Sequence, residues 1–287
     1  MKKVFVLFLC LVSVFIVFSC DGNGSGGGNG CDATTTPDDG NNQDDGSDCL
    51  GACGSDAKVV NVTTRSSGEY GSIDFMTASN VGFVSLKTTL TVPKRPSGST
   101  TQGTLFIWPG LMPGAGSGML SRGVIQPVLT WGSSCADMYA PKDTWWIAGM
   151  YVTGMGVCYS GDSMTVDIGD KLDIEITNNG TMWTQVVTNQ SNGRSVTYSK
   201  SMNGKTQWWA LFAIEIWEKA VKPTEDVIFT DTVLTFAGSA PAACMPSDIG
   251  PTDWLTSPHV SKDGTTCCIP KIILRAKGVA ATTPNAP

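Results

Sequence analysis

Much of this chain alternates between apolar and polar residues with the two-residue period of a β-strand. In residues 170–177 (DKLDIEIT), for example, Leu172, Ile174 and Ile176 fall on one face and charged residues fall on the other. This pattern predicts a strand with one buried face and one solvated face. Similar patterns predict further strands at residues 58–64, 81–92, 103–111, 123–131, 144–152, 162–168, 182–189, 194–201, 208–218 and 227–237.

Turn signals separate these segments, and no segment has a convincing helical period. The sequences Asn178-Asn179-Gly180, Ser191-Asn192-Gly193 and Asn203-Gly204 are typical of tight connections between antiparallel strands. Many alternating strands joined by such turns predict an all-β fold, either an antiparallel sandwich or a barrel.

Two polar residues interrupt otherwise apolar strand faces. In ALFAIEIWE (210–218), Glu215 shares a face with Leu211, Ala213 and Trp217, and in GVIQPVLTW (123–131), Gln126 occupies a similar position. A glutamate and a glutamine on one concave face make a sensible hydrolytic pair, because the carboxylate accepts a proton from water and the amide stabilises an oxyanion. The alternative is a buried structural pair that hydrogen-bonds to itself or to the backbone.

The chain begins with a segment that resembles a bacterial export signal. Two lysines precede an apolar run that ends at Val17-Phe18-Ser19-Cys20, which resembles a lipobox. We expect residues 1–19 to be a lipoprotein signal peptide and Cys20 to carry the lipid, while an uncleaved membrane anchor is the alternative. This predicts an exported, lipid-anchored protein of the bacterial cell envelope.

Residues 20–57 are rich in glycine and aspartate and predict a flexible tether. The net charge of the whole chain is −6, and the eight aspartates of this segment leave residues 58–287 with no net charge once the two signal lysines are counted. A neutral domain lacks the basic footprint of a nucleic-acid-binding protein, so we expect no nucleic-acid partner.

The strand signals place the folded part of the chain after the tether. We expect a β-sandwich domain at 58–238, followed at 239–287 by a cysteine-containing extension that packs on it.

The remaining cysteines favour disulfides over a metal site. After Cys10 and Cys20 are set aside, eight cysteines remain in an exported chain, which has one histidine and no Cys-x-x-Cys pair. We expect a Cys135–Cys158 bridge, and we expect Cys267 and Cys268 to take different partners, one of which is Cys244. The pairing of Cys31, Cys49 and Cys53 stays open. We expect no metal and no cofactor.

The order of motifs resembles the eqolisins, a family of glutamic peptidases with a concanavalin-like antiparallel β-sandwich. The resemblance covers residues 85–238 and rests on LTVP (90–93), GVIQPV (123–128), TWW (144–146), IGDKLDIEI (168–176) and ALFAIEIWE. It implies that Gln126 and Glu215 are the catalytic dyad, with Glu215 as the general base toward water and then the general acid toward the leaving amine. The amino-terminal Asn-Trp-Ala-Gly stretch of the family has no counterpart here, and Ile147 replaces a glutamate of the family's groove.

Tryptophans flank both candidate strands and suggest a groove. The candidate substrate-binding residues are Trp145, Trp146, Trp131 and Trp208. Adjacent tryptophans in a strand point to opposite faces, so one of each adjacent pair is available to a ligand. The resemblance thus implies a glutamic endopeptidase that acts on polypeptides in acid, and we expect a monomer. The alternative is a noncatalytic, lectin-like surface module that binds glycan or protein through a tryptophan-lined face.

Overall fold

The structure, a computed structural model, describes residues 48–62, 71–78, 80–98, 103–113, 123–140, 143–154, 156–217 and 221–282. The chain divides into two units, 1–43 and 44–287, and the described residues belong to the second. The predicted signal peptide, Cys20, Cys31 and most of the predicted tether lie outside the described residues. Within the described part, no helix is long and apolar enough to cross a membrane.

Nearly all described elements are strands. Their bounds are β1 Lys58–Val59, β2 Ser72–Met76, β3 Phe83–Thr91, β4 Ser97–Gly98, β5 Thr104–Met112, β6 Val124–Trp131, β7 Trp145–Val152, β8 Cys158–Val166, β9 Lys171–Asn178, β10 Met182–Asn189, β11 Ser195–Ser201, β12 Trp209–Trp217, β13 Val221–Lys222, β14 Val227–Phe236, β15 Pro246–Ile249, β16 Trp254–Leu255, β17 His259–Val260 and β18 Thr266–Leu274. One α-helix, α1 Asp48–Cys53, and one 3-10 turn, η2 Pro241–Cys244, complete the described elements.

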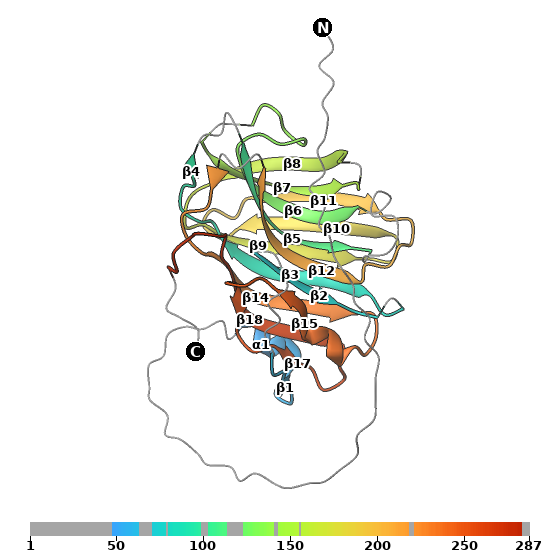
Figure 1. Cartoon of the computed structure of the whole chain (residues 1–287). Helices are drawn as coiled ribbons and strands as arrows, with labels where there is room; N and C mark the ends of the chain where they lie inside the picture. The colour runs from blue at the N-terminus through green and yellow to red at the C-terminus, as the bar shows by residue number, and fades with distance from the viewer. Residues whose placement is uncertain are drawn as a thin grey trace. The chain divides into compact units, whose positions relative to one another are not determined.

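The strands form two main antiparallel sheets (Figure 1). Sheet A has the order β1-β17-β18-β14-β3-β9-β10-β11, with β16 also paired to β18. Sheet B has the order β15-β2-β12-β5-β6-β7-β8, and β4 and β13 form a separate small pair. The prediction of an all-β antiparallel sandwich is confirmed.

The two sheets pack through their apolar faces to form the core. Phe212 of β12 meets Phe229 of β14 in a T-shaped contact with ring centroids 5.2 Å apart, which joins sheet B to sheet A. Ile107, Leu129 and Leu234 are completely buried in the same cluster. The opposite face of sheet B, which we call the outer face, carries its own apolar cluster built on Trp108, Val128, Trp146, Ala148, Met150 and Ala213.

Two of the predicted hairpin turns follow the expected chemistry. Gly180 and Gly193 adopt positive φ of 98° and 69° between paired strands β9-β10 and β10-β11. Glycine has no Cβ, so it adopts this conformation without steric strain. The predicted turns therefore connect the strands that the sequence assigned to them.

The carboxy-terminal part differs from the expected extension. β15 is an edge strand of sheet B, and β18 lies inside sheet A between β14 and β17. Pro270 interrupts the strand signal of β18, but it lies opposite Asp231 of β14, which has a φ of 53° and takes no part in the regular pairing. The backbone irregularity at Asp231 accommodates the missing N–H of Pro270.

Three disulfides are present in the described residues. Cys135–Cys158 is confirmed, and Cys267 and Cys268 take different partners as predicted, Cys244 and Cys53. Consecutive residues of a strand point to opposite faces, so Cys267 bonds on the core side and Cys268 bonds toward α1. The bridge from Cys53 orders the end of the segment predicted as tether, and α1 lies beside β18 (Figure 1).

Candidate functional site

Glu215 lies on the outer face of sheet B. In β12, Phe212 points to the core while Ala213 belongs to the outer apolar cluster, so the two-residue period places Glu215 and Trp217 on the outer side. Strand β2 pairs with β12 only as far as Ala213. Within the described residues, Glu215 therefore has a paired strand neighbour on one side only, β5, and its side chain is exposed.

Gln126 lies on the same face but at a different level. The register of β12, β5 and β6 places Glu215 level with Phe106 and Thr130. Gln126 of β6 lies four positions further along, near the level of Leu211. Four residues along a strand and two strand spacings give a Cα separation of about 16 Å. The two predicted dyad residues share a face, but the register does not bring them to one water molecule.

The sheet is interrupted beside Gln126. Pairing of β5 with β6 stops after Ile107–Leu129 and resumes at Leu111–Ile125. Pro109 and Pro127 occupy the interruption, and neither has an N–H to donate to the ladder. A proline is tolerated in a strand where no ladder donor is needed, so both prolines fit the break in the pairing.

The Gln126 side chain is available to a ligand. It is 7% exposed, and it makes no hydrogen bond with any residue that the structure describes. Its amide is not among the unpaired polar atoms that are sealed from solvent. A largely buried amide without a protein partner is unusual, because buried polar groups normally find one.

The environment of Glu215 disfavours its charged form. Desolvation by the surrounding protein raises the pKa of Glu215, and the Trp108 indole lowers it by a smaller amount. Among the described residues, the indole N–H of Trp108 has no partner of good hydrogen-bond geometry, so its contact with Glu215 is loose. The side chain nevertheless reaches solvent, so the carboxyl can exchange protons with water at a pH above its ordinary range.

Asp74 is a third polar residue of the outer face, and the sequence analysis missed it. It lies on β2 level with Leu211, is 6% exposed, and accepts a 2.7 Å hydrogen bond from the Trp209 indole. Burial and the neighbouring Asp248 raise the pKa of Asp74 to about 6. The signal was present in SIDFM (72–76), where an aspartate stands between two apolar residues that both face the core.

Unpaired polar atoms gather on this face. Among the described residues, five buried side-chain atoms have no hydrogen-bond partner, and three of them lie here: Asp74 Oδ1, Trp108 Nε1 and Thr130 Oγ1. Each unpaired buried group costs free energy, on the order of 1–3 kcal/mol. Such a concentration on one face is typical of a surface that is completed by a ligand rather than by the fold.

The predicted substrate-contacting tryptophans have different positions. Trp131 and Trp145 pack against each other in the core, with ring centroids 5.2 Å apart. Trp146 is on the outer side, but it is buried and donates its indole N–H to the Gly132 carbonyl at 2.8 Å. Trp208 is half-buried just before β12. Of these four, Trp146 is the one in the outer apolar cluster.

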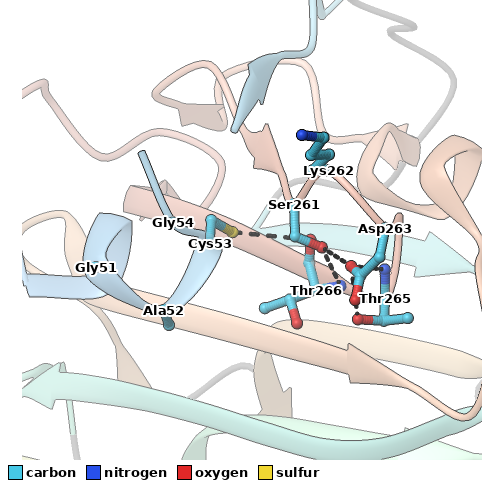
Figure 2. Close-up of a pocket in the computed structure, with 9 residues that line it drawn as sticks. All are labelled: Gly51, Ala52, Cys53, Gly54, Ser261, Lys262, Asp263, Thr265 and Thr266. Atoms are coloured by element: carbon cyan, nitrogen blue, oxygen red, sulfur yellow. Dashed lines mark hydrogen bonds between the residues drawn. The ribbon is translucent and has the colours of Figure 1, made fainter. Parts of the chain in front are cut away.

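A separate surface hollow lies beside α1 (Figure 2). Its polar groups bond to one another: Ser261 Oγ donates to Asp263 Oδ1 at 2.6 Å, and the Thr265 N–H and hydroxyl donate to the same carboxylate. These bonds lower the pKa of Asp263. The polar groups of this hollow are therefore already satisfied, unlike those of the outer face.

No protein family and no curated protein sequence matches the chain. Among solved structures, the chain is similar to scytalido-glutamic peptidase in complex with a transition-state analogue, with 17% identity and a TM-score of 0.47 over 72% of this chain and 99% of that chain. It is also similar to SCP-B, a member of the eqolisin family in complex with the tripeptide Ala-Ile-His, with 15% identity and a TM-score of 0.43 over 72% and 99% of the two chains. The lectin UEA-II complexed with galactose has 13% identity and a TM-score of 0.30 over 76% and 89%. The relationship to the eqolisin fold is remote.

Proposed function

We propose that this protein binds an extended polypeptide on the outer face of sheet B. The observation that carries the proposal is the Gln126 amide at the interruption between β5 and β6, which has no hydrogen-bond partner among the described residues. A primary amide presents a donor and an acceptor side by side, which complement the C=O and N–H of a peptide group. Gln126 is thus suited to anchor the main chain of a bound polypeptide.

The outer face suits a polypeptide better than a glycan. Sugar rings stack on exposed aromatic rings, but Trp108 and Trp146 of this face are 7% and 2% exposed. Trp217, at 43%, is the exposed large aromatic residue of β12. A floor of buried apolar side chains with scattered polar groups matches the alternating side chains and the backbone of an extended peptide.

Peptide hydrolysis in acid is the second candidate function, and the position of Glu215 favours it. Its carboxyl reaches solvent and has a raised pKa, so it can accept a proton from water and return one to a leaving amine. Gln126, about 16 Å away, would hold the peptide about five residues from the scissile bond rather than share the attacking water. The sequence resemblance to glutamic peptidases supports the role of Glu215, whereas the register of β12, β5 and β6 requires a different role for Gln126.

One experiment separates binding from hydrolysis. The full-length protein is mixed with fluorescein-labelled denatured casein from pH 3 to pH 7, with anisotropy reporting binding and fragment release reporting cleavage. We expect micromolar or tighter binding that Gln126→Leu weakens about tenfold, the scale of a lost hydrogen bond to a desolvated group. Gln190→Leu, at an exposed glutamine of a sheet A turn, is the matched control.

The outcomes distinguish the two functions. Cleavage in acid that Glu215→Gln abolishes would establish hydrolysis, while binding without cleavage would leave a noncatalytic module. Failure of the wild-type protein to bind casein at any of these pH values would overturn the proposal.

We further propose that the protein acts outside the cytoplasm. Three disulfides in the described residues are typical of exported proteins. The lipobox-like sequence before Cys20 supports a lipid anchor in the cell envelope as the means of attachment.

A further inference from the structure

Strand β7 is irregular at the position next to Gln126. Met150 of β7 pairs with Gln126 of β6 on one side. On the other side, the register between β7 and β8 shifts between Ala148 and Met150. Gln126 therefore lies between two irregular places, the proline-containing interruption toward β5 and the shifted register beyond β7.

A buried glutamine of the opposite sheet secures this position. Gln185 of β10 in sheet A is completely buried and reaches across the core to the backbone of Met150. Its Oε1 accepts the Met150 N–H at 3.1 Å, and its Nε2 donates to the Met150 carbonyl at 2.9 Å. One side chain thus satisfies both backbone groups of the residue that adjoins Gln126.

The backbone around Met150 is shaped to admit this contact. A Cβ added at Gly149 would lie 2.8 Å from the Tyr198 Cβ and 3.3 Å from the Gln185 Cβ. Glycine at position 149 therefore lets β7 approach sheet A closely enough for the Gln185 amide to reach. The two sheets are locked together here by two hydrogen bonds rather than by apolar packing alone.

We propose that Gln185 is a positioning residue for the ligand-binding amide of Gln126. By holding the backbone of Met150, Gln185 fixes the neighbouring strand and the Met150 side chain, which packs in the outer apolar cluster beside Gln126. The side chain of Gln126 has no protein hydrogen bond of its own within the described residues, so its orientation depends on these neighbours. This inference rests on the proposed function, since it assigns Gln185 to the same polypeptide site.

Two variants and one control test the proposal in the full-length protein with labelled casein. Gln185→Leu removes the side-chain amide that bonds to the Met150 N–H and C=O. We expect casein affinity about tenfold weaker than wild type at every pH, because losing a residue that orients a binding group typically costs about tenfold or more in affinity. Val187→Ala is the control. It removes two methyl groups from a completely buried core residue of the same strand without touching Met150.

Gln185→Glu tests whether casein affinity depends on the two hydrogen bonds to Met150, because the pH controls whether this variant can form them. A buried glutamate is protonated in acid, and its O–H and C=O then reproduce both hydrogen bonds to Met150. Tyr198, which lies level with Gln185 on β11, has a pKa raised by burial and does not lose its proton in this range. We expect the affinity of Gln185→Glu, relative to wild type at the same pH, to be restored at pH 4 and weakened at pH 7.

The results are read only where urea titration shows each variant to be folded. If Gln126→Leu weakens casein binding while Gln185→Leu binds like Val187→Ala, the positioning role is wrong and the binding face stands. If Gln185→Glu shows the same relative affinity at pH 4 and pH 7, the two hydrogen bonds do not control the site. Absence of wild-type binding would instead refute the proposed function itself.

Discussion

The sandwich should become more stable as the pH falls from 7 to 4. Burial raises the pKa of both Asp74 and Asp253 from 3.8 to about 6. Because each folded pKa lies above the unfolded value, the folded state binds protons that the unfolded state does not bind between these values. The resulting stabilisation is complete below about pH 4 and is lost as the pH rises through 6.

The size of the effect follows from the two shifts. A shift of about two pH units corresponds to roughly 3 kcal/mol, so the two carboxyls together give up to about 6 kcal/mol. Glu215 acts in the same direction. The pKa values of Asp170 and Asp263 are lowered below the ordinary value of 3.8, so these two carboxylates stabilise the folded state above that pH. Their contribution is lost only as the pH falls below about 4, and it does not oppose the rise in stability between pH 7 and pH 4.

Urea titration followed by tryptophan fluorescence at pH 4, 5, 6 and 7 measures this dependence. Asp74→Asn provides the matched variant, because an amide keeps the acceptor for Trp209 and cannot titrate. We expect a higher free energy of unfolding for this variant than for wild type at pH 7, and a pH dependence reduced by about half. A wild-type stability that is flat or falls between pH 7 and pH 4, or an Asp74→Asn variant with the wild-type slope, would show that these carboxyls do not control the stability.

Three further predictions concern the covalent structure and the packing. Replacing both Cys135 and Cys158 by serine should lower the free energy of unfolding by about 3 kcal/mol, as expected for a loop of this length, and peptide mapping without reduction should find the two joined in the wild-type protein. Gly149→Ala should destabilise the protein by about 1–3 kcal/mol, because the new Cβ would meet Tyr198, and an unchanged urea midpoint would contradict the close approach of the sheets there. Cys20→Ala should abolish incorporation of labelled fatty acid in cells, and label that persists in this variant would exclude the lipid anchor.

The predictable part of the fold is the part with regular alternation. Strands such as β9 and β10 have one core face and one solvated face, so their apolar residues recur at every second position. β18 was missed because Pro270 and two adjacent cysteines hide its period, and β2 was missed because it is short and contains Asp74. Both strands are fixed by distant partners, β14 for β18 and β12 for β2, which no local pattern reports.

The candidate site was predictable in its residues but not in its register. Gln126 and Glu215 were recognisable as polar interruptions of apolar faces, and both lie on the outer face as expected of such outliers. Their four-residue offset depends on how β5 pairs with β6 and β12, and this pairing is set by contacts far apart in the sequence. Gln185 was hidden because its partner is the backbone of another sheet.

Photo-cross-linking tests most directly whether the outer face of sheet B binds polypeptide. A photoreactive phenylalanine is placed in the full-length protein at Val124 or Trp217 on the outer face, or at Ile168, which is 55% exposed in the connection between β8 and β9. Trp217 is 43% exposed and is thus less accessible than Ile168, so exposure alone would not favour cross-linking at position 217 over position 168. We predict that labelled denatured casein cross-links at positions 124 and 217 and not at 168. Cross-linking at 168 that equals or exceeds cross-linking at 217 would contradict the account.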